Sequence, residues 1–504
     1  MKFFYKPAYY YILVDLSILF LSFYIVLAWL PLTTSTPFQK YSDVSFVYFI
    51  VWFFNSYILK RYRPLHKQKY WISIVRLFYT VILNFIVFWF LLHNFFKPYS
   101  GYVLLSFSLG VFIINYISLS IYYAYRLAID YNEIYFEPSE REDAALISLP
   151  KVDKESYQKI CEIINNHSGT RVLSYLKNQV DLYSGNTFLY INNSSANLQL
   201  IPKYRFQTIV QLEPLNNTLN INENLFVINE KLPDKGILIC CYESKSTRKA
   251  RILKKYPILI NYLIYLIDFI VKRMLPKIFL TSHLYNLIRN GKNQILSKAE
   301  VLGRLYCSGF ELVNEKKIGN LNFVIVQRVH PPQKEQVRVY GPLIRLHRIG
   351  KNGKLIQIYK FRTMHPYSEY LQSYIFERNN LKQGGKIKRD IRITSWGYFL
   401  RKYWLDELPM FFNWFKGETK LVGVRPLTPH YYSLYTSELQ NKRIQHKPGL
   451  LPPFYVDMPE TIDEIQASEM KYLIDCETYG TFKTDVKYFF RIIYNIIVKK
   501  ARSS

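Results

Sequence analysis

The chain has 504 residues and a formal net charge of +29, and half of its residues are hydrophobic. Its five cysteines form no CxxC and no ligand-spaced cluster, which excludes a disulfide framework or a zinc site and fits a reducing compartment. The length predicts two to four domains, and the excess of basic and aromatic residues indicates anionic partners, of which a membrane surface is the simplest.

Four apolar runs fill the N-terminal part and predict an α-helical membrane domain over residues 1–126. The runs are Tyr9–Leu30, Val44–Leu59, Ile72–Phe96 and Gly101–Tyr125. A bilayer core takes about 20 helical residues, so three runs are long enough to cross it and the second is marginal. Lys2, Lys6 and the loop KRYRPLHKQK are positive, which predicts that the N-terminus and everything after residue 126 lie in the cytoplasm. We expect these charges to be solvated or to contact lipid headgroups.

Residues 127–335 change to short β-rich runs between polar stretches. Five runs predict strands: RVLSYL, NTFLYIN, FQTIVQL, LFVIN and GILICC. A helix over AEVLGRLYCSGF and an antiparallel pair, FELVNEKK with LNFVIVQRV, then resemble the C-terminal part of Rossmann-like methyltransferases. No GxGxxG turn follows an early strand. We therefore expect a degenerate α/β Rossmann-like domain with a structural or regulatory role.

One segment of this middle region, residues 254–280, is apolar enough to contact a membrane. Its centre, Pro257–Val271, lies between pairs of basic residues and carries Asp268. The centre is too short to span a bilayer, and it suits a re-entrant or interfacial helix. A buried helix of the middle domain is the alternative.

Residues 336–504 carry a dense series of motifs. In chain order these are KFRTM, DIRIT, R-x4-DELP, KG-x3-LVGVRP and KPG. A K-N-G turn before LIQIYKF predicts a hairpin ahead of the first motif. A long Tyr-rich loop, HPYSEYLQSYIFERNNLKQGG, separates KFRTM from DIRIT, and a lid, a partner contact or neither are all open for it. Two adjacent carboxylates, Asp406 and Glu407, stand within DELP among apolar residues.

The order of these motifs resembles the bacterial sugar transferase family, the monotopic polyprenyl-phosphate phosphoglycosyl transferases, over residues 340–500. The N-terminal part resembles the large members of the family in architecture only. The resemblance implies an α+β catalytic domain over residues 336–504. It also implies transfer of a sugar 1-phosphate from a nucleotide diphosphate sugar, by default a UDP-sugar, to polyprenyl (undecaprenyl) phosphate with release of UMP. Such a step initiates exopolysaccharide, capsule or O-antigen synthesis at the bacterial cytoplasmic membrane; a homodimer is left open.

The family's site residues carry over onto matching positions. The aspartate of the DE pair, here Asp406, is the nucleophile that forms a covalent phosphosugar intermediate. The glutamate after it, here Glu407, assists with Mg²⁺, and the pair matching Arg425 and Pro426 helps form the nucleotide surface. A carboxylate nucleophile must be ionised, so we expect nearby cations to hold the pKa of Asp406 down. The candidates for this role are Arg401, Lys402, Lys360, Arg362 and Arg425.

Other charged residues of the motifs are candidates for substrate binding. Lys360 and Arg362 alternate along a strand-like segment, so they are predicted to share one face that suits a diphosphate. Asp390 and Arg392 are either a structural pair or part of the substrate site. Arg401 is expected to stabilise negative charge.

Simpler interpretations remain for the same residues. Asp406 and Glu407 also suit the solvated end of an amphipathic helix, with Lys402 as an i,i+4 partner and Pro409 ending or kinking the helix. The alternative function is a catalytically silent membrane scaffold of a polysaccharide assembly complex. A nucleic-acid partner is suggested by charge alone, and no nucleic-acid-binding motif supports it, so we expect none.

Three features depart from the family pattern. The polar stretch VHPPQKEQVRVY stands where members carry a long apolar re-entrant helix, so the usual membrane contact is in doubt. Val424 and Leu427 replace a common Pro and Glu, and HKPGLLPPFY replaces the usual continuation after KPG. Nucleotide contacts and the acceptor surface are therefore expected to differ.

Overall fold

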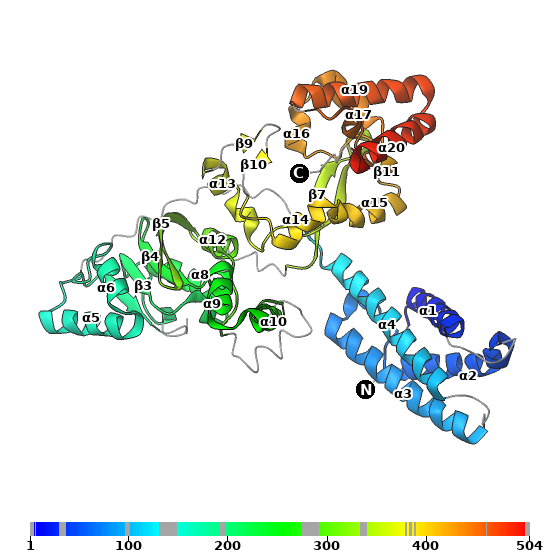
Figure 1. The fold of residues 1–504 in the computed structure, drawn as a ribbon, viewed down its shortest axis with the longest axis horizontal. Helices are drawn as coiled ribbons and strands as arrows, with labels where there is room; N and C mark the ends of the chain where they lie inside the picture. Colours follow the sequence, from blue (N-terminus) through cyan, green and yellow to red (C-terminus); the bar gives the residue numbers. More distant parts are fainter. Residues whose placement is uncertain are drawn as a thin grey trace. The chain divides into compact units, whose positions relative to one another are not determined.

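The computed structural model describes residues 5–498 apart from 6, 30–36, 96–100, 131–148, 192–197, 275–291, 333–339, 379–380, 383–385, 388–389 and 460. The chain divides into two compact units, Met1–Leu127 and Ala128–Ser504, which are described separately (Figure 1). Lys2 and Lys6, which entered the predicted orientation, lie outside the described residues, as do residues 275–280 of the apolar middle segment.

The N-terminal unit consists of apolar helices. They are α1 (Tyr9–Trp29), α2 (Pro37–Ile58), α3 (Tyr70–Phe95) and α4 (Gly101–Arg126), with a short 3-10 helix η1 (Leu65–Lys67). Three of them, α1, α3 and α4, are long and apolar enough to cross a membrane, whereas the apolar part of α2 is shorter. The three long helices indicate a membrane protein. Helix α2 contains the apolar run that the sequence analysis found only marginally long enough to cross a bilayer.

A buried ion pair lies inside this helical unit. Asp15 of α1 accepts from both terminal nitrogens of Arg61, at 2.6 and 2.8 Å, and Arg61 also donates to Asn115 of α4 at 2.7 Å. Trp52 and Tyr62 donate to the same carboxylate. Arg61 belongs to the basic loop, and the expectation of a solvated or lipid-facing charge is wrong for it, because Asp15 provides a buried partner.

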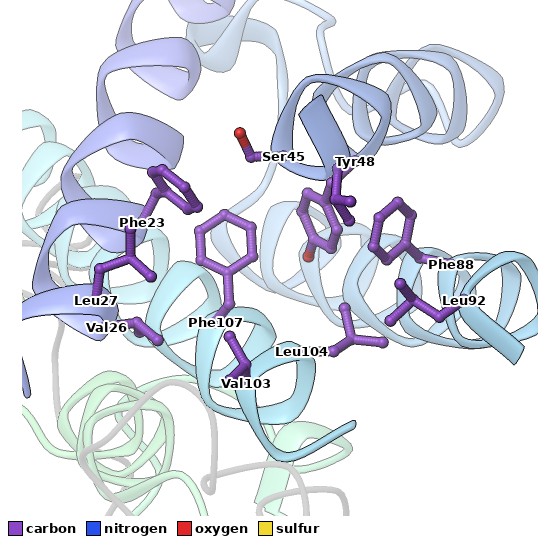
Figure 2. Close-up of a pocket in the computed structure, with 11 residues that line it drawn as sticks. Phe23, Val26, Leu27, Ser45, Tyr48, Phe88, Leu92, Val103, Leu104 and Phe107 are labelled. Atoms are coloured by element: carbon purple, nitrogen blue, oxygen red, sulfur yellow. The ribbon is translucent and has the colours of Figure 1, made fainter. Parts of the chain in front are cut away.

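A small apolar cavity lies between the helices of this unit (Figure 2). Its volume is about 40 Å³, and its lining includes Phe23, Tyr48, Phe88 and Phe107. Ser45 and Tyr48 are the polar residues of its lining, whereas a buried water typically makes about three hydrogen bonds. The cavity is therefore a packing gap of the bundle core.

The middle region is a sheet with helices on both faces. Its elements are α5 (Lys154–Ser168), α6 (Thr170–Lys177), β2 (Thr187–Tyr190), β3 (Thr208–Gln211), η2 (Leu215–Asn217), α8 (Ile221–Lys231), β4 (Ile237–Tyr242), α9 (Lys245–Lys255), α10 (Ile258–Phe269), the π-helix η3 (Ile270–Met274), α12 (Lys298–Cys307), β5 (Phe310–Ile318) and β6 (Leu321–Arg328). The strand order is β2-β3-β4-β6-β5, with β2, β3 and β4 parallel and β6 antiparallel to both of its neighbours.

Alternate residues of β4 supply the two faces of this sheet. Leu238 and Cys240 pack into the core that contains α8 and α12, whereas Ile239 and Cys241 pack into the core that contains α5 and α6. The helix and the antiparallel pair predicted for the end of the region are confirmed as α12, β5 and β6.

Two predicted strands of the middle region are wrong. RVLSYL lies in α6 and LFVIN lies in α8. Val172 and Leu176 are buried four residues apart, as are Ile221 and Leu225, which is the spacing of one helix face. Short apolar runs fit a strand and a buried helix equally well, so periodicity within the run could not decide between them.

The C-terminal region contains many short elements around small sheets. Its elements are β7 (Leu343–Ile349), η4 (Lys351–Gly353), β8 (Leu355–Phe361), η5 (Ser368–Leu371), α13 (Gln372–Arg378), β9 (Leu381–Lys382), β10 (Lys386–Ile387), α14 (Ser395–Lys402), η6 (Leu405–Met410), α15 (Phe411–Phe415), β11 (Lys420–Val422), α16 (Pro429–Ser433), α17 (Ser437–Ile444), β12 (Gly449–Leu451), α18 (Phe454–Asp457), α19 (Ile462–Tyr479) and α20 (Thr481–Ile497). Helices α17 to α20 share one core with β11, and together these elements give the α+β composition that the sequence predicts.

A short strand directly after α4 belongs to the C-terminal sheet. β1 (Ile129–Asp130) pairs in parallel with Ile344 and Arg345 of β7, and β7 pairs antiparallel with β8. The sequence boundary at residue 127 assigns β1 to the middle region instead. Because β1 precedes the middle region and β7 follows it, the middle region is an insertion between two neighbouring strands of one sheet.

The Tyr-rich loop after KFRTM packs against the middle region. Leu371, Tyr374 and Ile375 enter the core formed by α8 and α12. The Tyr367 hydroxyl accepts from Asn222 at 2.8 Å, and the Arg304 guanidinium lies 4.5 Å from the centre of the Tyr367 ring. A Cβ at Gly303 would stand 2.3 Å from the Tyr367 carbonyl oxygen, so this close approach of α12 requires glycine. This part of the loop thus forms a contact between two regions of the same chain, which was not among the three alternatives; a lid or a partner contact stays a prediction.

Candidate active site

The β7–β8 hairpin carries the first site residues. The predicted K-N-G turn is confirmed as η4, where Asn352 and Gly353 both have positive φ, the conformation such turns favour. Lys360 lies near the end of β8, opposite Ile344. Arg362 follows the strand; its Nε donates to the Gly341 carbonyl at 2.8 Å, and its guanidinium stacks over Tyr340.

The KFRTM and DIRIT motifs lie side by side. Met364 and Ile393 form an antiparallel bridge, and the Thr363 carbonyl accepts from both the backbone and the hydroxyl of Thr394, which caps α14. A Cβ at Gly397 would stand 2.0 Å from the Thr363 carbonyl oxygen, so α14 approaches this segment closely. Arg401 of α14 donates to the Thr363 hydroxyl at 3.0 Å.

Asp390 and Arg392 form a buried ion pair with each other. Arg392 donates to Asp390 from its backbone nitrogen, Nε and Nη2, and both side chains are buried. The His365 nitrogen donates to the Arg392 carbonyl at 2.8 Å. The two residues thus form the structural pair of the sequence analysis, and their place in the substrate site stays a prediction.

The stretch RKYWLDELPMFF is not one amphipathic helix. α14 ends at Lys402, Trp404 adopts the left-handed conformation with φ 62°, and η6 begins at Leu405. The i,i+4 relation of Lys402 and Asp406 on one helix face is thus wrong, since the helix is interrupted between them. Pro409 does not end a helix either; it lies buried within η6, and α15 continues from Phe411.

The turn at Trp404 directs η6 back across β8 and brings the two carboxylates to Lys360. Buried Met410 anchors η6 against Ile356 and Ile358 of β8. The Lys360 ammonium lies 2.5 Å from Glu407 Oε1, and both side chains are less than one-fifth exposed. Asp406 is half-buried next to this pair.

The pKa of the Asp406 carboxyl is raised above its usual value. Burial is the largest cause, because it removes the ionised form from water. The positive charge of Lys360 acts in the opposite direction, as does that of Arg401, while Glu407 adds to the rise. The expectation that cations hold this pKa down is therefore wrong in its net direction, although two of the candidate cations, Lys360 and Arg401, do lower it.

Asn413 is a site residue that sequence reasoning missed. Its buried side chain makes two hydrogen bonds to the backbone of β8, as a neighbouring strand would. It accepts from the Tyr359 backbone nitrogen at 3.1 Å and donates to the Gln357 carbonyl at 2.7 Å. It thereby fixes α15, and η6 before it, to the strand that carries Lys360. A lone polar residue in the apolar run PMFFNWF was the available signal, because a buried amide needs partners.

Arg425 and Pro426 lie at the other end of the hairpin. The Leu427 carbonyl accepts from the nitrogen of Ile349, the last residue of β7. About 17 Å of strand separates Ile349 from Ile344, which lies opposite Lys360. Arg425 is exposed, and Arg443 donates to its carbonyl oxygen at 2.5 Å. The structure thus brings Lys360, Arg401, Asp406 and Glu407 together and places Arg425 and Pro426 apart from them.

The carboxylates suit a Mg²⁺ ion that arrives with a substrate. No group of three or more His, Cys, Asp or Glu side chains suitable for a metal occurs in the described parts of the chain. Mg²⁺ at phosphate-transferring sites is typically held by one or two carboxylates together with substrate phosphates. Glu407, adjacent to Asp406, fits such a partial ligand set.

Exposed aromatic and aliphatic side chains flank the carboxylates along the chain. They come from α14, η6, α15 and the turn between α14 and η6, and they are Trp396, Tyr398, Phe399, Tyr403, Leu408, Phe411, Phe412, Trp414 and Phe415. So many exposed apolar side chains within 20 residues are unusual on a protein in water and indicate a contact with a membrane or a partner. We refer to these residues as the aromatic face.

Comparison with known proteins matches the same region. Residues 336–499 match the family described as Bacterial sugar transferase. The galactosyl transferase CpsE of Streptococcus agalactiae serotype III is 34% identical over 148 residues, which cover 28% of this chain and 33% of that protein.

Two further relatives carry names that specify an acceptor. The undecaprenyl-phosphate galactose phosphotransferase of Salmonella typhimurium is 37% identical over 24% of this chain and 27% of its own. The UDP-glucose:undecaprenyl-phosphate glucose-1-phosphate transferase of Klebsiella pneumoniae is 39% identical over 22% of each chain. The matches span a third or less of the length of these relatives. Residues 336–499 of this chain therefore match the bacterial sugar transferase family, as the order of its motifs predicts.

Proposed function

We propose that this protein transfers a sugar 1-phosphate from a nucleotide diphosphate sugar, by default a UDP-sugar, to undecaprenyl phosphate. The observation that carries the proposal is the half-buried Asp406 beside the Lys360–Glu407 pair, within residues that match the sugar transferase family. Phosphoryl transfer depends on positioning and on neutralising charge on the transferred oxygens, and Lys360 and Arg401 supply positive charge here. Relatives named as undecaprenyl-phosphate transferases support the acceptor.

The proposed reaction has two displacements. A carboxylate oxygen of Asp406 attacks the sugar-bearing phosphorus, the bond from that phosphorus to the oxygen of the nucleotide's phosphate breaks, and UMP leaves. An oxygen of the polyprenyl phosphate then attacks the aspartyl-bound phosphorus, which releases Asp406 and forms the lipid diphosphate sugar. A Mg²⁺ ion held by Glu407 and substrate phosphates would neutralise the diphosphate. Asp390 and Arg392 act by holding their loop, and Arg425 with Pro426 contributes a nucleotide surface at the hairpin end.

The protein is proposed to work at the cytoplasmic face of a bacterial membrane. Three long apolar helices support a multi-pass membrane protein, and the basic loop after α2 supports a cytoplasmic C-terminal unit. The aromatic face would contact the bilayer next to the carboxylates, where the polyprenyl acceptor resides. We further propose that the middle region is a degenerate Rossmann-like domain, supported by its parallel β2, β3 and β4 with helices on both faces.

A donor screen tests this proposal. The full-length protein is reconstituted with undecaprenyl phosphate, Mg²⁺ and a panel of nucleotide sugars, and release of nucleoside monophosphate is measured. We expect release with one donor class, loss of release when the metal is chelated, and a phosphosugar adduct on the peptide that contains Asp406 when the acceptor is omitted.

Variants distinguish the enzyme from a silent scaffold. Asp406→Asn is expected to abolish both the adduct and turnover, whereas Asp463→Asn, at an exposed acid in the first turn of α19, is expected to leave both intact. A full panel with no lipid-linked product would favour the scaffold. An Asp406→Asn protein with full turnover would contradict the covalent step.

A further inference from the structure

Helix α10 presents an apolar face that the described parts of the chain leave exposed. Tyr262 is 62% exposed, Leu263 57%, and Leu266 and Ile267 just over half. Ile258 and Ile260 extend the same exposure toward the start of the helix. The alternative of a buried helix for this part of residues 254–280 is thus wrong. We refer to these six residues as the α10 face.

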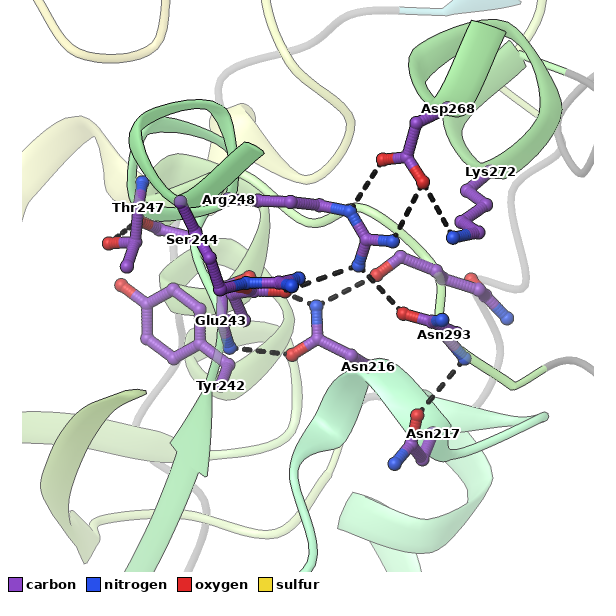
Figure 3. Close-up of polar contacts among 12 residues, drawn as sticks. Asn216, Asn217, Tyr242, Glu243, Ser244, Thr247, Arg248, Asp268, Lys272 and Asn293 are labelled. Atoms are coloured by element: carbon purple, nitrogen blue, oxygen red, sulfur yellow. Dashed lines mark hydrogen bonds and ion pairs between the residues drawn. The ribbon is translucent and has the colours of Figure 1, made fainter. Parts of the chain in front are cut away.

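The acid of this helix is directed toward the protein. Asp268 accepts from Arg248 Nε at 2.6 Å and Nη2 at 3.0 Å, and from Lys272 Nζ at 2.5 Å (Figure 3). Arg248 is itself buried and also donates to Asn293. The negative charge of α10 is therefore neutralised inside the middle region, and the α10 face carries none.

A rim of basic residues borders the α10 face. Helix α9 packs against α10 and contains six basic residues and no acid. Three of its lysines, Lys249, Lys254 and Lys255, are exposed and form the rim. The Lys249 ammonium lies 5.6 Å from the ring centre of Tyr265 and 5.8 Å from that of Tyr262. Burial lowers the pKa of Lys245, and the neighbouring charges of Arg273 and Lys249 lower it further, which indicates a positive local potential.

The dimensions of α10 decide how it could meet a membrane. Its 12 residues span about 18 Å at 1.5 Å each, whereas a bilayer core is about 30 Å thick. The helix is thus too short to cross. An apolar face with a lysine-rich border is the pattern of helices that lie in the interface plane, with their cations among lipid phosphates.

We propose that the α10 face inserts into the interface of a bilayer rich in anionic lipids, with the lysines of α9 at the headgroups. The middle region thereby forms a membrane contact of its own, separate from the N-terminal helices and from the carboxylate site. Its occupant is the lipid surface because exposed aliphatic side chains lie beside the exposed lysines Lys249, Lys254 and Lys255. The two arginines of α9 pair with acids of the middle region instead.

Lipid-resident quenchers test the proposal in the full-length protein. Cys161, which is half-buried, is replaced by serine, and the other four cysteines are buried. A bimane label is attached at Leu263→Cys, with Leu266→Cys as a second position. The matched control is Val313→Cys on β5, since Val313 and Leu263 are both 57% exposed. The protein is reconstituted in phosphatidylcholine and phosphatidylglycerol vesicles that contain acyl-chain nitroxide lipids.

We expect the nitroxide lipids to quench the fluorescence of labels at positions 263 and 266 but not at 313. The fluorescence at 263 and 266 should recover when neutral lipid replaces phosphatidylglycerol. Absence of loss at both α10 positions would overturn the proposal. A disulfide between two copies of the unlabelled Leu263→Cys protein, with no quenching of the labelled protein, would assign the face to a second copy of this chain. Quenching that is unchanged in neutral vesicles would overturn the role of the basic rim.

Discussion

At the scale of single residues, the carboxyl of Asp406 is held in a balance between burial and nearby cations. Burial raises its pKa, and Lys360 is the cation that opposes the rise most. The motifs of the sequence predicted that Asp406 and the cations Lys360 and Arg401 would lie close together. They could not predict the net direction, because burial depends on how η6 packs onto β8, and residue order alone does not contain that contact.

Replacing Lys360 should shift the pH dependence of turnover. In the proposed reaction Asp406 attacks as a carboxylate, so activity is expected to fall as pH drops through its raised pKa. Lys360→Gln removes the main opposing charge, which raises that pKa further and moves the acid limb of kcat/KM to higher pH. Lys354→Gln, at an exposed lysine beside the hairpin turn, should leave the limb in place. If the acid limb of kcat/KM in Lys360→Gln stays at the wild-type pH, Lys360 does not influence the ionisation of Asp406.

Replacing Asp406 should also change thermal stability in a pH-dependent way. A carboxyl whose pKa is higher in the folded state favours folding below its unfolded pKa and loses that contribution as pH rises through the folded value. Asp406→Asn should therefore raise the Tm in detergent at neutral pH, with the difference shrinking in acid. A lower Tm at neutral pH would indicate that the ionised carboxylate stabilises the fold.

At the scale of elements, the motifs were easier to predict than their connections. The hairpin, α12 and the β5–β6 pair follow from turn residues and apolar runs. The break at Trp404 does not, because tryptophan has no preference for positive φ and tertiary packing imposes the turn. The same limit applies to RVLSYL and LFVIN, whose helical state depends on which neighbours cover them.

The amide of Asn413 should be needed to hold η6 in place. Asn413→Leu leaves the Tyr359 nitrogen and the Gln357 carbonyl without this partner, and each buried unpaired group costs about 1–3 kcal/mol. We expect a lower Tm and a loss of turnover greater than the loss of folded protein. Asn441→Leu, at an exposed position of α17, is the control. Equal effects of the two changes would show that Asn413 has no positioning role.

The ion pair inside the N-terminal helices should act as a unit. Asp15→Leu leaves Arg61 buried without its carboxylate, and an unpaired buried charge costs about 3–5 kcal/mol. The double variant Asp15→Leu/Arg61→Leu should recover much of that loss in thermal unfolding. Additive losses in the double variant would contradict the coupling. The lone acid in the first apolar run was the sequence signal, since intramembrane charges seek partners.

At the scale of the whole C-terminal unit, the middle and C-terminal regions are interleaved. The Tyr-rich loop supplies side chains to the middle core, and Tyr367 is held by Asn222 and Arg304. Domain boundaries drawn from sequence at residues 127 and 335 follow changes in composition. Composition does not reveal these contacts, because they join Tyr367, on one side of the boundary at residue 335, to Asn222 and Arg304, on the other side.

The position of β1 has a practical consequence for the isolation of the part that matches the family. A fragment that starts at residue 336, where the family match begins, lacks the strand that covers one edge of β7. Unpaired strand edges are templates for intermolecular pairing. We expect such a fragment to self-associate in size-exclusion chromatography more than the intact chain does; a monodisperse fragment would show that β1 is dispensable. The strand that pairs with this edge of β7 thus lies some two hundred residues before the first residue of the family match.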